Sequence, residues 1–169
     1  MILIGIGSNL AAAGFASPLE TAAASLARLS SVGIEVRRRS RWYMSQPVPP
    51  SDQPWYVNGV ASVETALAPM ALLEALLAVE AGFGRRRGVP DAARTLDLDL
   101  LDYDAAQCAG ERLVLPHPRL HERRFVLAPL AEIAPQWRHP RSWKTAAELL
   151  AALPPGQQPV QALADPARP

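Results

Sequence analysis

Apolar and polar residues follow two different spacings along the chain, and these spacings predict its secondary structure. Alternating or mostly apolar stretches bounded by turn residues predict strands over residues 2–10, 34–45, 55–65 and 94–104. Apolar residues at helical spacing predict helices over residues 17–29 and 68–84. A short strand, a proline-punctuated turn and a short helix are expected over residues 113–135, and a last small helix over residues 144–153.

The order of these elements predicts the fold class. Strands and helices alternate as β-α-β-β-α-β, which is typical of an α+β fold, a ferredoxin-like α/β sandwich around a mainly antiparallel sheet. The start of the first helix has local support, because Ser17 can cap it, Pro18 suits its first position and Glu20 can complete a capping box. We expect a single domain over residues 1–153 and a Pro/Ala-rich tail over residues 154–169 that frays.

Composition excludes several classes of protein. The chain has 169 residues and one cysteine, Cys108, so an internal disulfide is excluded and no Cys/His cluster predicts a zinc site. The N-terminus lacks the basic region of a signal peptide, and no apolar stretch reaches the 18 residues of a membrane span. We therefore expect a cytoplasmic protein that has no membrane partner.

Arginine dominates the basic residues, although the formal net charge is only +1. Arginines cluster at residues 37–41, 85–87 and 119–124, whereas Lys144 is the single lysine. Arginine binds phosphate in a bidentate manner, so these clusters indicate anion sites. A GC-rich genome is the alternative explanation, because it favours both arginine and alanine codons.

The strand "RTLDLDLLDYD" contains two acids, Asp97 and Asp99, that should share one face. Such a carboxylate pair suits a hard divalent cation, above all Mg²⁺ shared with substrate phosphates. The alternative is a solvated edge strand whose acids prevent aggregation. Leucines fill the other face and arginines flank the pair, which favours phosphate chemistry. If the two acids only repel each other, removing either should not destabilise the ligand-free protein.

Two further groups of residues indicate binding. "PHPRLHERRF" (116–125) gathers His117, His121 and three arginines, which favours an anion site, although Phe125 within it could simply be core. Tyr56 and Asn58 share a strand face, and an aromatic ring beside an amide suits a flat heteroaromatic ligand. Core and turn roles are the alternatives for this second pair.

Four motifs together resemble one family, the bacterial 6-hydroxymethyl-7,8-dihydropterin pyrophosphokinases. They are "IGIGSNL", "DQPWYVNGVASVET", "RTLDLDLL" and "LPHPRLHERRFVLAPLAEIAP", and the resemblance covers residues 2–143. It implies the transfer of the β,γ-pyrophosphoryl group of ATP to the hydroxymethyl group of the dihydropterin, with release of AMP and two Mg²⁺ ions as cofactors. It also implies a role in making folate precursors. The expected partners are these two small molecules, with no nucleic acid, and a monomer is expected.

The resemblance also implies roles for individual residues. Asp97 and Asp99 would bind the metal ions, and the arrival of Mg²⁺ and ATP would relieve their repulsion. Arg85 and Arg94 would be catalytic through the transferring phosphates. The other implied contacts are listed here: Ser45, Val48, Tyr56, Asn58 and Phe125 with the pterin, and Glu80, Arg85, Arg87, Arg94, His117 and Arg123 with the nucleotide.

The chain departs from the family in one loop, and two rival functions stay open at this stage. "VPDAAR" stands where many members have a Trp-Gly-Pro run, so closure of the loop at residues 85–94 over the substrates is an open question. One rival is another Mg²⁺-dependent phosphotransferase or nucleotidyltransferase on a ferredoxin-like core. The other is a nucleic-acid-binding ferredoxin-like module, which the low aromatic content of 6% and the net charge of +1 disfavour.

Overall fold

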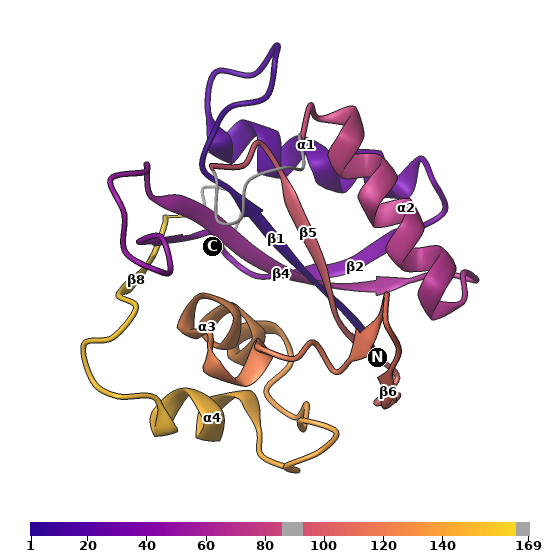
Figure 1. Cartoon of the computed structure of the whole chain (residues 1–169), viewed down its shortest axis with the longest axis vertical. Coiled ribbons are helices and arrows are strands. Elements are labelled where there is room, and N and C mark those ends of the chain that lie inside the picture. The colour runs from indigo at the N-terminus through magenta and orange to yellow at the C-terminus, as the bar shows by residue number, and fades with distance from the viewer. Residues whose placement is uncertain (86–92, 165–169) are drawn as a thin grey trace.

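A computed structural model of the chain describes residues 1–85 and 93–164. Figure 1 shows a sheet with helices on both of its faces. The elements run in the order β1 (Ile2–Ser8), α1 (Pro18–Ser30), β2 (Glu35–Arg39), β3 (Tyr43–Ser45), β4 (Tyr56–Glu64), α2 (Pro69–Gly82), β5 (Asp97–Tyr103), β6 (Cys108–Ala109), β7 (Val114–Leu115), the 3₁₀ turn η1 (Leu120–Glu122), α3 (Arg124–Ile133), α4 (Ala146–Ala152) and β8 (Val160–Ala162). None of the described helices is long and apolar enough to cross a membrane.

The main sheet confirms the predicted ferredoxin-like topology. Its strands lie in the order β5-β1-β4-β3-β8, with β2 also paired to β4, and every pairing is antiparallel. Because β2 and β3 both pair with β4, together they take the place of one edge strand in the β-α-β-β-α-β pattern. A separate small sheet joins β6 and β7.

The single strand predicted over residues 34–45 is two strands, and Ser40 is where it breaks. The Ser40 amide donates to the Val60 carbonyl at 2.9 Å, and the Ser40 hydroxyl accepts from the Val60 amide at 3.1 Å. A side chain thus replaces one rung of the backbone ladder. Trp42 turns into the core over Gly59, where an added Cβ would lie only 2.8 Å from the indole ring.

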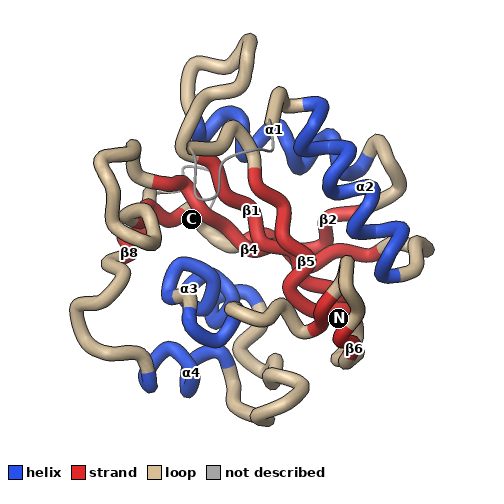
Figure 2. The backbone as a smooth tube through the Cα atoms, viewed as in Figure 1, coloured by secondary structure: helices blue, strands red, loops and turns tan. Residues whose placement is uncertain are grey.

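Helices α1 and α2 lie over one face of the main sheet and α3 and α4 over the other (Figure 2), and each face buries a separate core. One core lies under α1 and α2 and includes Ile4, Leu72 and Leu98. The other lies under α3 and α4 and includes Leu101 and Leu127. Burial on both faces explains why β1 reads as a continuous apolar run.

Simple alternation along strand β5 places the acid pair. Leu98 and Leu100 enter the core under α1 and α2, so Asp97 and Asp99 project from the opposite side of the strand, with Asp99 facing the start of α3. Leu101 continues the alternation on the side of the acids and enters the core under α3 and α4.

The expectation of a frayed tail is wrong for residues 160–162. These residues form β8, which pairs Val160 with Ser45 and Ala162 with Tyr43. Leu163 also donates its amide to the Trp42 carbonyl at 2.8 Å. This part of the tail is therefore a strand of the main sheet.

Candidate active site

Asp97 lies between two arginines that reach it from different parts of the chain. Arg85 follows the end of α2 and donates to Asp97 Oδ1, while Arg94 precedes β5 and donates to Asp97 Oδ2. Burial acts to raise the Asp97 pKa, but the two guanidinium groups outweigh it and hold that pKa below its usual value. Asp97 is therefore an anion at neutral pH, and its two oxygens already have cationic partners.

Glu80, in the last turn of α2, pairs with Arg85 and orients it. This carboxylate is only 2% exposed, and it accepts from Arg85 and, at 2.8 Å, from the Leu98 amide of β5. The contact ties the end of α2 to the strand that carries the acid pair. Glu80 therefore fixes the arginine directly, whereas the sequence predicts a contact with the nucleotide.

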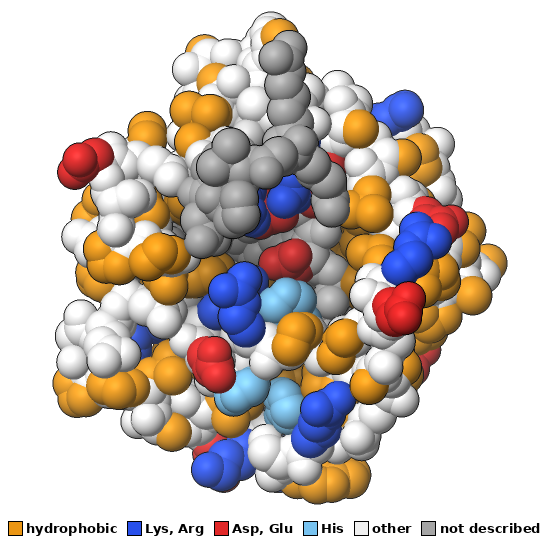
Figure 3. All heavy atoms as spheres, in the orientation of Figure 1, with side chains coloured by type: hydrophobic (Ala, Val, Ile, Leu, Met, Phe, Trp, Pro, Cys, Tyr) orange, Lys and Arg blue, Asp and Glu red, His pale blue; other side chains and the backbone are white. Residues whose placement is uncertain are grey.

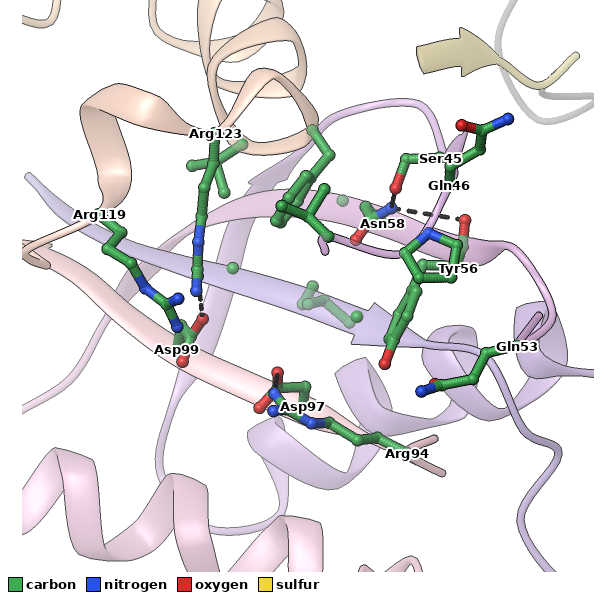
Figure 4. A pocket seen from close by; sticks show the side chains of 18 of the residues that line it. Ser45, Gln46, Gln53, Tyr56, Asn58, Arg94, Asp97, Asp99, Arg119 and Arg123 are labelled. Atoms are coloured by element: carbon green, nitrogen blue, oxygen red, sulfur yellow. Dashed lines mark hydrogen bonds and ion pairs between the residues drawn. The ribbon is translucent and has the colours of Figure 1, made fainter. Parts of the chain in front are cut away.

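Asp99 faces the loop and turn that lead into α3 (Figure 4). Arg123 Nη1 donates to Asp99 Oδ2 at 3.2 Å, and His117 Nε2 lies 3.9 Å from the same oxygen. His117 Nδ1 accepts from the Arg119 amide at 3.2 Å, so the ring proton is on Nε2 and points toward Asp99. Burial lowers the His117 pKa despite the nearby carboxylate, so the ring is neutral at pH 7.

A second group of side chains forms a largely apolar pocket beside the acid pair. Asn58 is buried and donates to Ser45 Oγ at 2.9 Å, and Tyr56 and half-buried Phe125 also line the space. Gly7 also lines this space, and a Cβ there would reach ordinary contact distance, 3.6 Å, from Asn58 Oδ1. The proline-rich loop supplies a further part of the lining: Gln46, Pro47, Val48, Pro49, Ser51 and Gln53.

A second, more polar pocket adjoins the first. It is lined by Glu80, Arg85, Glu111, Arg112 and His117 together with leucines of α2. Five residues line both pockets, and they are Arg94, Asp97, Asp99, Arg119 and Arg123. Figure 3 shows acidic, basic and histidine side chains gathered around the hollow on this face. The acid pair therefore stands at the boundary between the largely apolar pocket and the more polar, arginine-rich pocket.

The described acids do not form a metal cage on their own. No group of three or more His, Cys, Asp or Glu side chains within residues 1–85 and 93–164 could hold a metal ion. Two partly exposed carboxylates on one strand face, with side chains 18% and 34% exposed, nevertheless fit Mg²⁺ well. This ion prefers oxygen ligands and usually takes its remaining ones from substrate phosphates and water.

Asn9 is a residue of the site that the sequence does not single out. Its side chain is 1% exposed; Nδ2 donates to Gln53 Oε1 at 3.1 Å and to the Pro54 carbonyl at 3.2 Å. Its Oδ1 accepts from the Arg94 amide at 2.7 Å, and its own amide donates to the Arg94 carbonyl. Asn9 thus ties Arg94 to the loop that lines the apolar pocket. The sequence feature that could have identified Asn9 is its place in "GSN", at the end of a buried strand.

The structure brings most of the predicted site residues together. Asp97, Asp99, Arg94 and Arg123 line both pockets, and the expected ring-binding residues, including exposed Val48, line the first. The histidine- and arginine-rich segment divides, because His121 and Arg124 line neither pocket. Arg87 lies outside the described residues, as does most of the loop at residues 85–94.

Comparisons with known proteins identify relatives of this chain. A family model described as 7,8-dihydro-6-hydroxymethylpterin-pyrophosphokinase (HPPK) matches residues 3–135. The chain is 45% identical over 149 residues to the 2-amino-4-hydroxy-6-hydroxymethyldihydropteridine pyrophosphokinase of Synechocystis, a match covering 88% of this chain and 73% of that protein. It is 41% identical over 154 residues to the protein of the same name in Pseudomonas aeruginosa, with 90% and 91% covered.

A solved structure supports the fold. HPPK-DHPS of Plasmodium falciparum matches with a TM-score of 0.62 at 13% identity, covering 89% of this chain and 43% of that one. This likeness bears on the fold alone, whereas the family model and the close relatives confirm the resemblance predicted from the four motifs. The chain belongs to the 7,8-dihydro-6-hydroxymethylpterin-pyrophosphokinase family.

Proposed function

We propose that this enzyme transfers the pyrophosphoryl group where its two pockets meet, over Asp97 and Asp99. Members of the family are ATP-dependent pyrophosphokinases of folate biosynthesis, so the type of reaction follows from membership. The observation that carries the assignment of the site is the sharing of Arg94, Asp97, Asp99, Arg119 and Arg123 by both pockets. A group passed from one substrate to another has to lie within reach of both.

The apolar pocket would bind 6-hydroxymethyl-7,8-dihydropterin. Tyr56 and Phe125 line it and supply aromatic faces for a flat ring. Asn58, oriented by Ser45, presents an amide that can pair with donors and acceptors on the ring edge. Held in this way, the hydroxymethyl oxygen would face the acid pair.

The polar pocket would bind ATP. Its arginines and His117 present N–H donors, which suit phosphate oxygens. His117 acts as a donor in this arrangement, because its Nδ1 is already occupied by the Arg119 amide. We therefore assign it to holding phosphate rather than to removing the proton of the attacking hydroxyl group.

The transfer forms one bond at the β-phosphorus of ATP and breaks another. The hydroxymethyl oxygen of the pterin bonds to the β-phosphorus of ATP while the bond from that phosphorus to the α-phosphate oxygen breaks. AMP leaves with the freed oxygen, and the proton of the hydroxymethyl group passes to solvent. Asp97 and Asp99 would hold two Mg²⁺ ions, which supply neutralisation of the polyphosphate charge when bound.

The arginines change partners as substrates bind. In the ligand-free chain, Arg85 and Arg94 pair with Asp97, and Arg123 pairs with Asp99. Asp97 and Asp99 would hold the cations, and the guanidinium groups that pair with them here would then be free to contact the phosphates. There they can stabilise charge that develops during transfer.

Product analysis tests this proposal directly. The protein is incubated with ATP and 6-hydroxymethyl-7,8-dihydropterin, with Mg²⁺ or with a chelator, and nucleotides and pterins are separated. We expect AMP and pyrophosphorylated pterin in equal amounts, and only with Mg²⁺. Release of ADP instead of AMP would contradict the proposal.

Light scattering of the same protein measures its molar mass and so tests the expected monomer.

A further inference from the structure

Helix α3 begins in the middle of the site but lacks a cap of its own. Arg123 occupies the N-cap position and makes no side-chain capping hydrogen bond, because a guanidinium group only donates and cannot accept from a free N–H. Its guanidinium group donates to Asp99 instead. Phe125, one of the proposed pterin contacts, is the second residue of the helix. The start of α3 therefore carries Arg123, which lines both pockets, and Phe125, which lines the apolar one, yet the free N–H groups of the first turn need a partner from elsewhere.

That partner comes from the C-terminal tail. Gln158 Oε1 accepts from the Arg124 amide at 2.9 Å, and Gln158 Nε2 donates to the Glu122 carbonyl at 3.0 Å. One side-chain amide thus bridges the last residue of η1 and the first residue of α3. Gln158 itself has a φ of 50°, in the left-handed region that a residue with a side chain seldom adopts. Its bonds to α3 help to hold this conformation.

Arg124 fastens the tail from the other side. Its Nε donates to the Gln157 carbonyl at 3.0 Å, and its Nη2 donates to the Pro154 carbonyl at 3.2 Å. The sequence placed Arg124 in the anion-binding cluster. The structure turns it away from both pockets and uses it to hold the tail.

The tail then continues to the opposite wall of the apolar pocket. Two residues after Gln158, strand β8 pairs Val160 with Ser45, the residue that orients Asn58. Figure 4 shows β8 as the yellow strand beyond Ser45 and Gln46, and Figure 1 shows the tail running from α4 past α3 to this edge. One segment thus links the wall that carries Phe125 to the wall that carries Ser45.

We propose that Gln158 is a positioning residue for the pterin pocket, acting as a cap supplied to α3 from the tail. The inference rests on the proposed function, because it takes this pocket to be the pterin site. Gln158 and β8 lie outside residues 3–135, the part that the family model matches. The cap fixes the first turn of α3 and so the direction of the Phe125 side chain. Strand β8 fixes β3, which carries Ser45 on the other side of the pocket.

Substitution of Gln158 by asparagine removes the capping hydrogen bonds while the residue can still adopt the left-handed backbone conformation. Asparagine tolerates the left-handed region, but its side chain is one methylene shorter and cannot reach both partners. Gln157→Asn is the matched control, because Gln157 is exposed and contacts Arg124 through its backbone carbonyl. Gln158→Gly also removes the cap while relieving the backbone strain.

Pterin affinity is measured by titration of full-length protein with Mg²⁺ and a non-hydrolysable ATP analogue present. We expect Gln158→Asn and Gln158→Gly to raise the pterin Kd by about three- to thirtyfold, the span of a lost helix cap. Gln157→Asn should match the wild type. The melting temperature of Gln158→Gly should equal or exceed that of Gln158→Asn, so the weakening follows the cap and not global stability.

Hydrogen exchange gives a readout that needs no ligand. The Arg124 amide should exchange faster in Gln158→Asn than in the wild type or in Gln157→Asn. An unchanged Arg124 exchange rate, or an unchanged pterin Kd in Gln158→Asn beside a wild type that binds, would overturn the positioning role alone. A wild type that neither binds nor turns over the pterin would overturn the proposed function and this role with it.

Discussion

Arg123 Nη1 lies 3.2 Å from Asp99 Oδ2, so an arginine suited to phosphate and an acid suited to a metal ion are paired in the ligand-free protein. Asp97 has the same relationship with Arg85 and Arg94. The two carboxylates on one strand face are thus stabilised before any ligand arrives. The arginines therefore already offset the repulsion that, as the resemblance implies, Mg²⁺ and ATP would relieve.

This pairing reverses the expected effect of Asp97→Asn on stability. The substitution leaves Arg85 and Arg94, which are mostly buried, without their shared anion. We expect the free energy of unfolding of the ligand-free protein to fall by about 1–3 kcal/mol at pH 7. Urea denaturation measures it, with the exposed Asp52→Asn as the control. An Asp97→Asn variant as stable as the wild type would show that the ion pairs contribute nothing.

The same pairing predicts a pH dependence. The Asp97 pKa lies below its ordinary value of 3.8 in the folded chain, so its stabilising contribution is present above that value and is lost as the pH falls through the folded pKa. We expect the stability difference between wild type and Asp97→Asn to be constant from pH 7 to about 5 and to shrink below about 4. Urea titrations at several pH values measure the difference. A gap that widens in acid would contradict the lowered pKa.

Arg85→Ala and Arg94→Ala should lower kcat more than they weaken ATP binding. Both groups act on charge that develops during transfer, and removing one such donor typically costs about 10²–10³ in kcat. Steady-state kinetics and titration with an ATP analogue separate the two effects. Arg37→Ala is the control, because Arg37 of β2 pairs with Glu64 of β4 and lines neither pocket. If only the Kd for ATP changes, the two arginines are ground-state anchors.

The pterin pocket predicts that ring area matters more than the tyrosine hydroxyl group. Phe125→Ala should weaken pterin binding by about 1–3 kcal/mol, as expected for loss of a stacking partner. Tyr56→Phe keeps its ring and should bind pterin nearly as tightly as the wild type. Titrations with Mg²⁺ and an ATP analogue present measure both. Unchanged pterin affinity in Phe125→Ala would assign that ring to the core under α3 and α4, against which it also packs.

Asn9 should affect both substrates, because its side chain joins Arg94 to the proline-rich loop. We expect Asn9→Ala to lower kcat and raise the KM for pterin, with kcat/KM down by about 10- to 100-fold, as for misplaced catalytic groups. Asn9→Asp keeps the acceptor for the Arg94 amide and loses the donor to Gln53 and Pro54. It should spare kcat more than KM. If both variants changed kcat and KM to the same extent, Asn9 would not be acting separately on Arg94 and on the proline-rich loop.

Local patterns predicted most of the fold. The apolar run of β1 and the helical spacing of α2 each depend on neighbours close in sequence, so the sequence carries them clearly. The cap at Ser17 was also local, and its hydroxyl accepts from the Glu20 amide at 3.1 Å. Glu20 itself reaches the Ala16 amide rather than completing a capping box.

The features that the sequence did not predict depend on distant partners. Strand β8 has three residues and exists because β3, more than a hundred residues earlier, offers it a free edge. The motifs identified the acid pair and its arginines, but not that they neutralise one another. Asn9 gave no periodic signal, since its role comes from contacts with Gln53 and Arg94.

The central claim is that Asp97 and Asp99 exchange their arginines for Mg²⁺ when ATP binds. Calorimetric titration of the non-hydrolysable ATP analogue, with and without saturating Mg²⁺, tests it most directly in the wild type, Asp97→Asn and Asp99→Asn. We predict that Mg²⁺ strengthens binding of the analogue to the wild type far more than to either variant, and that both variants lose at least about a hundredfold in turnover. Equal Mg²⁺ dependence of binding in all three proteins, with near wild-type turnover in both variants, would contradict the account.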